Sequence, residues 1–455
     1  MNENGMPQGG TNEKKNKKTL KKVLIAVACV AAAVLLFVSG FFASRLFMDK
    51  GLRSLLWFKE RIQSEYYEEI SDEEFWDAAI EGVEGILDKY SGYYSSEEYD
   101  AVLSSDKGIS SGLGISIVNG TNRIYSISLG SPLFLAKSAS GERAQAGMYI
   151  TGIGSSADQI ADTFDFDTLF ARLGEIGSGE CYVRLSAAAP DDTVNAFIVV
   201  AEKKVYTESH VLYATNRATY IELFDENAKN GVWTKIGDGM SGLADGEAYI
   251  RFTQFTGNAA EEFEKAVSQY KADGCDTLLL DLRENGGGYL SILQEVASYL
   301  MKDADGKSPV MYAKSKNSTV KYLSSGDKYE EYFAGSKIYV AANENTASAS
   351  EALIGAMICY GTLSYGDIYL TKTAAAGDSS ARTYGKGIMQ TTWRNPSTGE
   401  AAKLTTAYLY WPDGTTCIHG KGVTAEDGAN TVAAETNYDL GDPALSKIFA
   451  DIRTR

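Results

Sequence analysis

Three hydroxyl side chains alternate in the stretch ENTASASEALIGAM: Thr346, Ser348 and Ser350. A strand-like run, KIYVAAN, precedes them, and a helix-like run, SEALIGAMICYG, follows. A turn from a strand into a helix is a place where an α/β enzyme exposes a nucleophile. A serine hydroxyl is a weak nucleophile until a nearby base takes its proton. The chain has only two histidines, His210 and His419, so a different base has to be considered.

The segment TYGKGIMQTTW supplies a candidate base. Lys386 lies between two glycines at the start of a predicted strand, and Gln390 follows on the same face. A lysine in a desolvated pocket has a lowered pKa and can act as a general base. A strand lysine on its own is more often a solvated surface residue, so the assignment depends on what surrounds it.

Glycines mark two further places. The run LLLDLRENGGGYL puts Gly286, Gly287 and Gly288 after a buried strand and before a helix, where backbone N–H groups can approach a ligand or simply form a tight turn. It is not a phosphate loop, because GxxxxGK[ST] and GxGxxG are both absent. The run GISSG fits GxSxG, but a strand follows it where a hydrolase elbow needs a helix, which argues against Ser110 as a nucleophile.

Composition sets limits on the function. The chain has 455 residues, is 44% hydrophobic and 23% charged, and so has room for several globular domains. Its formal net charge of −17 argues against nucleic-acid binding. Five cysteines without CxxC spacing and two distant histidines give no metal-ligand pattern, so we expect neither a metal nor a cofactor.

The N-terminal region predicts a membrane anchor. Residues 23–42, VLIAVACVAAAVLLFVSGFF, are uncharged and long enough to cross a bilayer as a helix. Lysines in residues 1–22 predict a cytoplasmic tail, with the rest of the chain outside the cytoplasm and the protein in the cell membrane. The alternative is a cleaved signal peptide, although the apolar run is longer than usual for one.

Periodicity divides the rest of the chain into a multidomain α+β and α/β fold. Residues 52–105 have helical spacing, with a capping box at Ser71 and Glu74. Short strands and glycine turns predict a β-rich module and then a polar connector; alternating strands and helices follow, which predict an α/β core. The predicted segments are 106–204 for the module, 205–247 for the connector, 248–430 for the core and 431–455 for a C-terminal segment.

Seven motifs in register make residues 60–430 resemble the C-terminal processing, or tail-specific, serine proteases, which carry an inserted PDZ domain. In order they are EGILDKYSGYYSSEEY, GLGISI, AYIRFTQF, LLLDLRENGGG, TASASEALIGAM, YGKGIMQ and LTTAYLYWPDGTTCIHGKG. The resemblance implies a PDZ-like module and a ClpP/crotonase-like α/β protease core, with an extracytoplasmic location.

The resemblance also implies catalytic roles. The nucleophile falls on Ser348, the general base on Lys386 and a supporting amide on Gln390, with an oxyanion hole from the backbone N–H groups of Gly288 and Ala349. Two features depart from the family: an insertion before the lysine, DIYLTKTAAAGDSSAR, which could cover or displace the site, and the long connector.

The PDZ resemblance rests on Gly112, Leu113, Gly114 and Ile115, whose backbone N–H groups would bind a terminal carboxylate. A side chain at Gly114 is expected to crowd that carboxylate. The expected partners are protein or peptide substrates with apolar C-termini and a membrane, with an oligomer possible. The alternative function is a catalytically silent peptide-binding scaffold, against which the intact catalytic motifs argue.

Overall fold

The computed structural model describes residues 21–23, 25, 27–37, 39, 48–225, 230–302, 304–373, 381–434 and 442–455. Two compact units divide the chain, Met1–Ile86 and Leu87–Arg455. Most of the predicted tail and part of the predicted span at 23–42 lie outside the described residues. Among the residues that are described, no helix combines the length and the apolar character needed to cross a membrane.

The first unit includes the helices α2 (Lys50–Glu65) and α3 (Asp72–Glu84). The predicted capping box at the start of α3 is confirmed. The Glu74 N–H donates to the Ser71 hydroxyl at 3.1 Å, and the Ser71 N–H donates to the Glu74 carboxylate at 2.8 Å. The box satisfies two backbone donors that a helix start leaves without partners.

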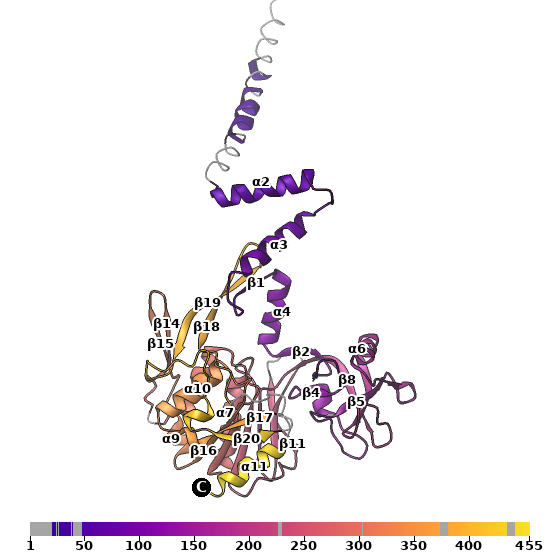
Figure 1. Ribbon diagram of the computed structural model, residues 1–455, viewed down its shortest axis with the longest axis vertical. Helices are drawn as coiled ribbons and strands as arrows, with labels where there is room; N and C mark the ends of the chain where they lie inside the picture. Colours follow the sequence, from indigo (N-terminus) through magenta and orange to yellow (C-terminus); the bar gives the residue numbers. More distant parts are fainter. Residues whose placement is uncertain are drawn as a thin grey trace, which may run out of the picture. The chain divides into compact units, whose positions relative to one another are not determined.

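An eight-stranded sheet forms the core of the second unit (Figure 1). In spatial order its strands are β11 (Gly231–Gly237), β10 (Thr219–Phe224), β9 (Val211–Ala214), β12 (Glu247–Phe252), β13 (Thr277–Asp281), β16 (Lys337–Ala342), β17 (Ile368–Thr373) and β20 (Asn430–Ala434). The strands from β11 to β12 are antiparallel, and those from β12 to β20 are parallel. Parallel strands need crossover connections, and helices supply those between β12 and β17.

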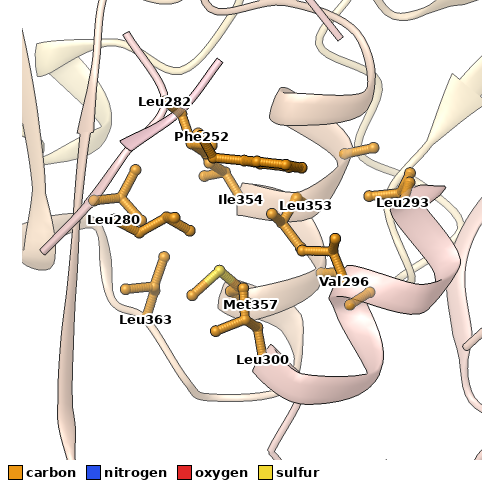
Figure 2. Close-up of a cluster of buried hydrophobic side chains, with 14 of the residues drawn as sticks. Phe252, Leu280, Leu282, Leu293, Val296, Leu300, Leu353, Ile354, Met357 and Leu363 are labelled. Carbon is orange, nitrogen blue, oxygen red and sulfur yellow. The ribbon is translucent and has the colours of Figure 1, made fainter. Parts of the chain in front are cut away.

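Helices cover both faces of this sheet. Leu278 and Leu280 on β13 pack into one hydrophobic cluster with the helices α7 (Ala259–Ala272), α8 (Leu290–Leu300) and α10 (Ala349–Cys359). Figure 2 shows part of this cluster, with Leu280 near Leu353 and Met357 of α10. Leu279 points to the opposite cluster, which α11 (Pro443–Ile452) covers. The parallel strands are therefore buried on both faces, which fits the consecutive leucines at 278–280.

Residues 205–247, predicted to be a connector, instead supply three strands of the core sheet. All four residues of β9 are buried, alternately in the two clusters. Polar residues within β10 and β11, and the irregular register at Thr219 and Tyr220, hid the period of two from the sequence pattern. The predicted C-terminal segment 431–455 likewise contributes to β20 and forms α11.

A second, five-stranded antiparallel sheet carries the segments around Lys386. Its strands are β1 (Gly92–Tyr94), β14 (Pro309–Ser315), β15 (Thr319–Leu323), β18 (Ile388–Arg394) and β19 (Ala401–Tyr410). Strand β19 pairs with β1, β14 and β18. Two helices, α4 (Ser96–Asp106) and α9 (Tyr329–Phe333), and two short 3₁₀ turns, Tyr365–Asp367 and Ala425–Asp427, complete the core.

The β-rich module has its own hydrophobic cluster. A five-stranded sheet contains β2 (Ile109–Gly112), β8 (Phe197–Thr207), β7 (Gly179–Ser186), β5 (Tyr149–Gly154) and β6 (Ala161–Asp162), in that order. A separate hairpin pairs β3 (Ile115–Ile117) with β4 (Ile124–Ile127). The helices are α5 (Pro132–Leu135) and α6 (Phe166–Glu175), with a 3₁₀ turn at Ala157–Gln159.

A buried ion-pair network ties α11 to the end of β13. The guanidinium of Arg283, which is 2% exposed, donates to the carboxylates of Asp281 and of Asp442, with the Asp442 contact at 2.6 Å. Asp442 also caps the first turn of α11. Removing one partner from such a network leaves an uncompensated buried charge, which typically costs about 3–5 kcal/mol.

Candidate active site

Ser348 occupies the sharp turn between β16 and α10. Its φ of 57° lies in the left-handed region, which only one other described non-glycine residue, Glu284, adopts. Such a conformation is strained for a residue with a Cβ and persists where neighbours hold it. The neighbouring Ala347 N–H donates to the Asn285 carbonyl at 2.9 Å, which joins this turn to the loop after β13.

The two flanking hydroxyls are structural. The Thr346 hydroxyl donates to the Leu282 carbonyl at 2.8 Å, and the Ser350 hydroxyl donates to the Asn285 carbonyl at 3.0 Å. Both side chains are fully buried, whereas Ser348 is half-buried and lines a cleft. Of the three alternating hydroxyls, the structure makes Ser348 the one that a substrate can reach.

The triple glycine lies against this turn. A Cβ at Gly287 would be 2.8 Å from the backbone N of Ala349, and a Cβ at Gly288 would be 2.3 Å from the Phe255 carbonyl oxygen. Glycine is therefore required for the close approach, which the tight-turn interpretation alone does not explain. Within the described residues the N–H groups of Gly288 and Ala349 donate to no acceptor. Two free donors at a helix start favour a developing negative charge.

The cleft brings the predicted catalytic residues together. It has a volume of about 720 Å³ and is lined by Ser348, Lys386, Gln390 and the three glycines. Tyr289, Tyr322 and Leu409 add apolar surface to its walls. We call this hollow the active-site cleft.

Lys386 lies in the loop that leads into β18. Burial lowers the pKa of its amine, and the nearby Lys403 ammonium lowers it further. Among the described residues no hydrogen bond joins the Ser348 hydroxyl to the Lys386 amine, and such contacts commonly form only when substrate binds. The Gln390 amide, beside a register shift in β18, donates to the Thr405 hydroxyl at 3.1 Å.

Glu351 is a site residue that sequence reasoning missed. Its fully buried carboxylate accepts from the Ser348 N–H at 3.0 Å and from the Lys386 N–H at 2.9 Å. It also accepts from the Thr383 hydroxyl at 2.6 Å and the Gly385 N–H at 2.8 Å. Burial raises the pKa of this carboxyl, while these four donors lower it. Glu351 thus connects the backbone of the nucleophile turn to that of the lysine loop, and the pattern S-x-x-E at 348–351 could have predicted this position.

The hydrogen bonds of Glu351 to Gly385 and Lys386 also show how the chain continues after the predicted insertion. Its first part is strand β17, and residues 374–380 lie outside the described part of the chain. The loop that follows is fixed to α10 through Glu351, and Lys386 lines the active-site cleft. The insertion has therefore not displaced the lysine.

Other predicted positions lie apart from the cleft. Ser110 is in strand β2, and its hydroxyl donates to the Glu208 carboxylate at 2.8 Å. His210 is buried at the end of the module, where burial lowers its pKa to about 4. His419 lines two neighbouring pockets. No group of residues in the described ranges could hold a metal ion.

The predicted carboxylate-binding loop belongs to the module. Gly112 and Gly114 have φ values of 113° and 77°, and Leu113 is buried. A Cβ at Gly114 would be 2.1 Å from that of Ser131 and 2.7 Å from the Tyr206 hydroxyl. The expectation that it would crowd a bound ligand is therefore wrong, because it points into the module's interior.

Comparison with known proteins places the core in a family. Residues 247–364 match the model of peptidase family S41. A probable CtpA-like serine protease of Staphylococcus aureus is 33% identical over 201 residues, covering 42% of this chain and 37% of that protein. The Staphylococcus haemolyticus counterpart is 29% identical over 197 residues, covering 42% and 36%. The matched region thus spans little more than a third of these relatives.

Among solved structures, the photosystem II D1 C-terminal processing protease aligns over 86% of this chain and 91% of its own, at 20% identity and a TM-score of 0.43. The resemblance inferred from the motifs is confirmed: residues 247–364 match peptidase family S41, and the chain is similar to CtpA-like serine proteases.

Proposed function

We propose that this protein is a serine endopeptidase that cleaves by an acyl-enzyme mechanism with Ser348 as nucleophile and Lys386 as base. The neutral lysine amine takes the proton of the Ser348 hydroxyl as the oxygen bonds to the scissile carbonyl carbon. The carbonyl oxygen becomes an oxyanion, and the N–H groups of Gly288 and Ala349 bind it. Each such donor is typically worth about 3 kcal/mol of the barrier.

The second half of the reaction reuses the same groups. When the tetrahedral intermediate collapses, the C–N bond breaks and Lys386 returns its proton to the leaving amine. Water then attacks the Ser348 ester and gives its proton to the lysine. The bond between the acyl carbon and the Ser348 oxygen breaks, Lys386 returns the proton to that oxygen, and the acid product leaves. Gln390 lines the same cleft as the lysine, and its proposed role is to orient the amine.

The observation that carries this proposal is the strained turn at Ser348, whose hydroxyl lines one cleft with a partly desolvated lysine and a backbone donor pair. A turn with φ of 57° costs stability, so its retention favours a catalytic role over a silent scaffold.

Substrate recognition is proposed to involve the module as a PDZ-like domain. In the described residues β3 pairs with β4 alone, so its other edge is available for an added peptide strand. Residues 112–115 at the start of β3 would receive the terminal carboxylate, and an apolar last residue would be preferred. Residues 23–42 are proposed to anchor the enzyme in the cell membrane, with its core outside the cytoplasm.

A fluorophosphonate probe tests the catalytic proposal directly. An activated serine hydroxyl displaces fluoride from the probe and forms a stable ester. Wild-type ectodomain should be labelled on Ser348, and a folded Ser348→Ala variant should not. Absence of labelling in the folded wild type would leave the peptide-binding scaffold as the better account.

A further inference from the structure

The ring of Tyr90 lies against the amine of the proposed base. The Lys386 Nζ atom is 5.0 Å from the ring centroid, within the range of a cation–π contact. Tyr90 is half-buried and comes from the segment before β1, far from Lys386 in sequence. The catalytic mechanism derived above gives it no role.

Hydrogen bonds hold the ring in place. The Tyr90 hydroxyl donates to the Tyr384 hydroxyl at 3.2 Å, and the Lys89 amine donates to the same oxygen at 2.7 Å. The next residue, Ser91, accepts from the Thr405 N–H at 2.9 Å. The Thr405 hydroxyl in turn accepts a hydrogen bond from the Gln390 amide. The segment that carries Tyr90 is therefore fixed to the pair of strands β18 and β19, which carries Gln390.

Tyr90 lines two hollows other than the active-site cleft. One hollow, the Lys89 pocket, has a volume of about 630 Å³ and is lined by Lys89, Tyr90 and Tyr384. The other, the Tyr408 pocket, has about 480 Å³ and is lined by Tyr90, Thr405 and Tyr408. Lys386 lines neither of them and Tyr90 lines both, whereas the active-site cleft is lined by Lys386 and not by Tyr90.

We propose that the Tyr90 ring is the wall that keeps water in these two pockets away from the Lys386 amine and thereby sets the pH range in which the lysine acts as a base. The inference rests on the proposed Ser348–Lys386 mechanism. It makes Tyr90 a positioning residue that acts through the lysine.

Two opposing effects of the ring have to be weighed. Contact with a π face favours the ammonium form, whereas exclusion of water favours the neutral amine. Burial is the largest influence on this lysine, and it lowers the pKa. Removing the ring should therefore hydrate the amine and raise its pKa.

Charged groups around the amine also act on its pKa. Lys403 on β19 lowers the pKa of Lys386, and it is opposed by Tyr384, Asp88 and Glu351, which raise it. Tyr384 accepts a hydrogen bond from Tyr90, and Tyr90→Phe removes that bond but keeps the ring. A shift that appears in Tyr90→Ala and not in Tyr90→Phe therefore reports water access.

The test measures how fast a fluorophosphonate labels Ser348 between pH 6 and pH 10, in four purified ectodomains. They are wild type, Tyr90→Phe, Tyr90→Ala and Tyr408→Ala. The last is a matched control, since Tyr408 lines the Tyr408 pocket and is 52% exposed, and Lys386 does not line that pocket. Labelling should rise with pH in each protein, because the lysine must lose its proton before it can accept that of serine.

In Tyr90→Ala we expect the pH at which the labelling rate rises to be about one unit higher than in wild type. Labelling at pH 7 should then be roughly tenfold slower and should recover at high pH. Tyr90→Phe and Tyr408→Ala should match the wild type. Should Tyr90→Ala fail to fold, Tyr90→Leu, which blocks water only in part, should move in the same direction by less.

If the labelling rate of Tyr90→Ala rises at the same pH as in wild type but reaches a lower plateau, the ring has only a structural role and the inference is overturned. An equal shift in Tyr408→Ala would also overturn it. Neither result would affect the proposed Ser348–Lys386 mechanism. A folded wild type that resists labelling at every pH would refute both that mechanism and this inference.

Discussion

Replacing Glu351 by glutamine should uncouple the nucleophile from its base. The substitution keeps the shape of the side chain but turns one oxygen, which accepts two of the four hydrogen bonds, into an NH₂ group that faces two donors. Hydrogen bonds to a charged acceptor contribute about 1.5–3 kcal/mol each. The neutral side chain is less costly to bury, so a net loss of about 2–4 kcal/mol in the free energy of unfolding is expected.

Two measurements follow from this magnitude. The thermal midpoint should fall by about 5 °C or more, and labelling of Ser348 by a fluorophosphonate should slow about a hundredfold, because the turn and the lysine loop lose their common anchor. Glu261→Gln, at an exposed position in the first turn of α7, is the matched control and should change neither quantity noticeably. A Glu351→Gln protein with wild-type stability and labelling would refute the view that this carboxylate positions Ser348 and Lys386.

The remaining predictions concern catalysis, recognition and topology. Ser348→Ala and Lys386→Ala should each abolish peptide cleavage with little change in the thermal midpoint, and retained turnover in either would contradict its assigned role. His419→Ala should remain active in the same assay, and so should His210→Gln, chosen because alanine would leave a cavity at this buried site; a folded but inactive variant would reopen a histidine mechanism. Amidating the C-terminus of an apolar-ended peptide should weaken binding about tenfold to a hundredfold, by loss of charge-assisted hydrogen bonds, and equal cleavage of both forms at sub-saturating concentration would count against recognition of C-termini. N-terminal sequencing of the cell-associated protein should find residues 23–42 still attached, and a chain beginning near residue 44 would instead indicate a cleaved signal.

Much of the core was predictable because its elements have strong local signals. The alternation of strands and helices in the core was predicted, and so was the strand–turn–helix at Ser348. The apolar residues of β13 predicted a buried strand. By contrast, β9, β10 and β11 were interpreted as a connector, because short strands that mix polar and apolar residues show no clear period.

The parts of the site that escaped prediction depend on contacts between distant segments. Tyr90 and Thr405 are 315 residues apart by their numbers, and only the pairing of β1 with β19 brings their segments together. Glu351 has a local signal as a helix-capping residue, but its hydrogen bonds to Thr383, Gly385 and Lys386 require the fold. The interior direction of a Cβ at Gly114 likewise depends on Ser131, which no local pattern reveals.

The buried link between Arg283 and Asp442 has a consequence for biosynthesis. Arg283 directly precedes the turn that carries Gly288, yet one of its two carboxylate partners is supplied by residue 442. A growing polypeptide that has not yet reached residue 442 has Arg283 without its second counter-ion, next to the turn that carries Gly288. On the proposed mechanism, proteolytic competence should therefore arise late, after α11 has docked, so that a nascent chain does not attack its neighbours before it has finished folding.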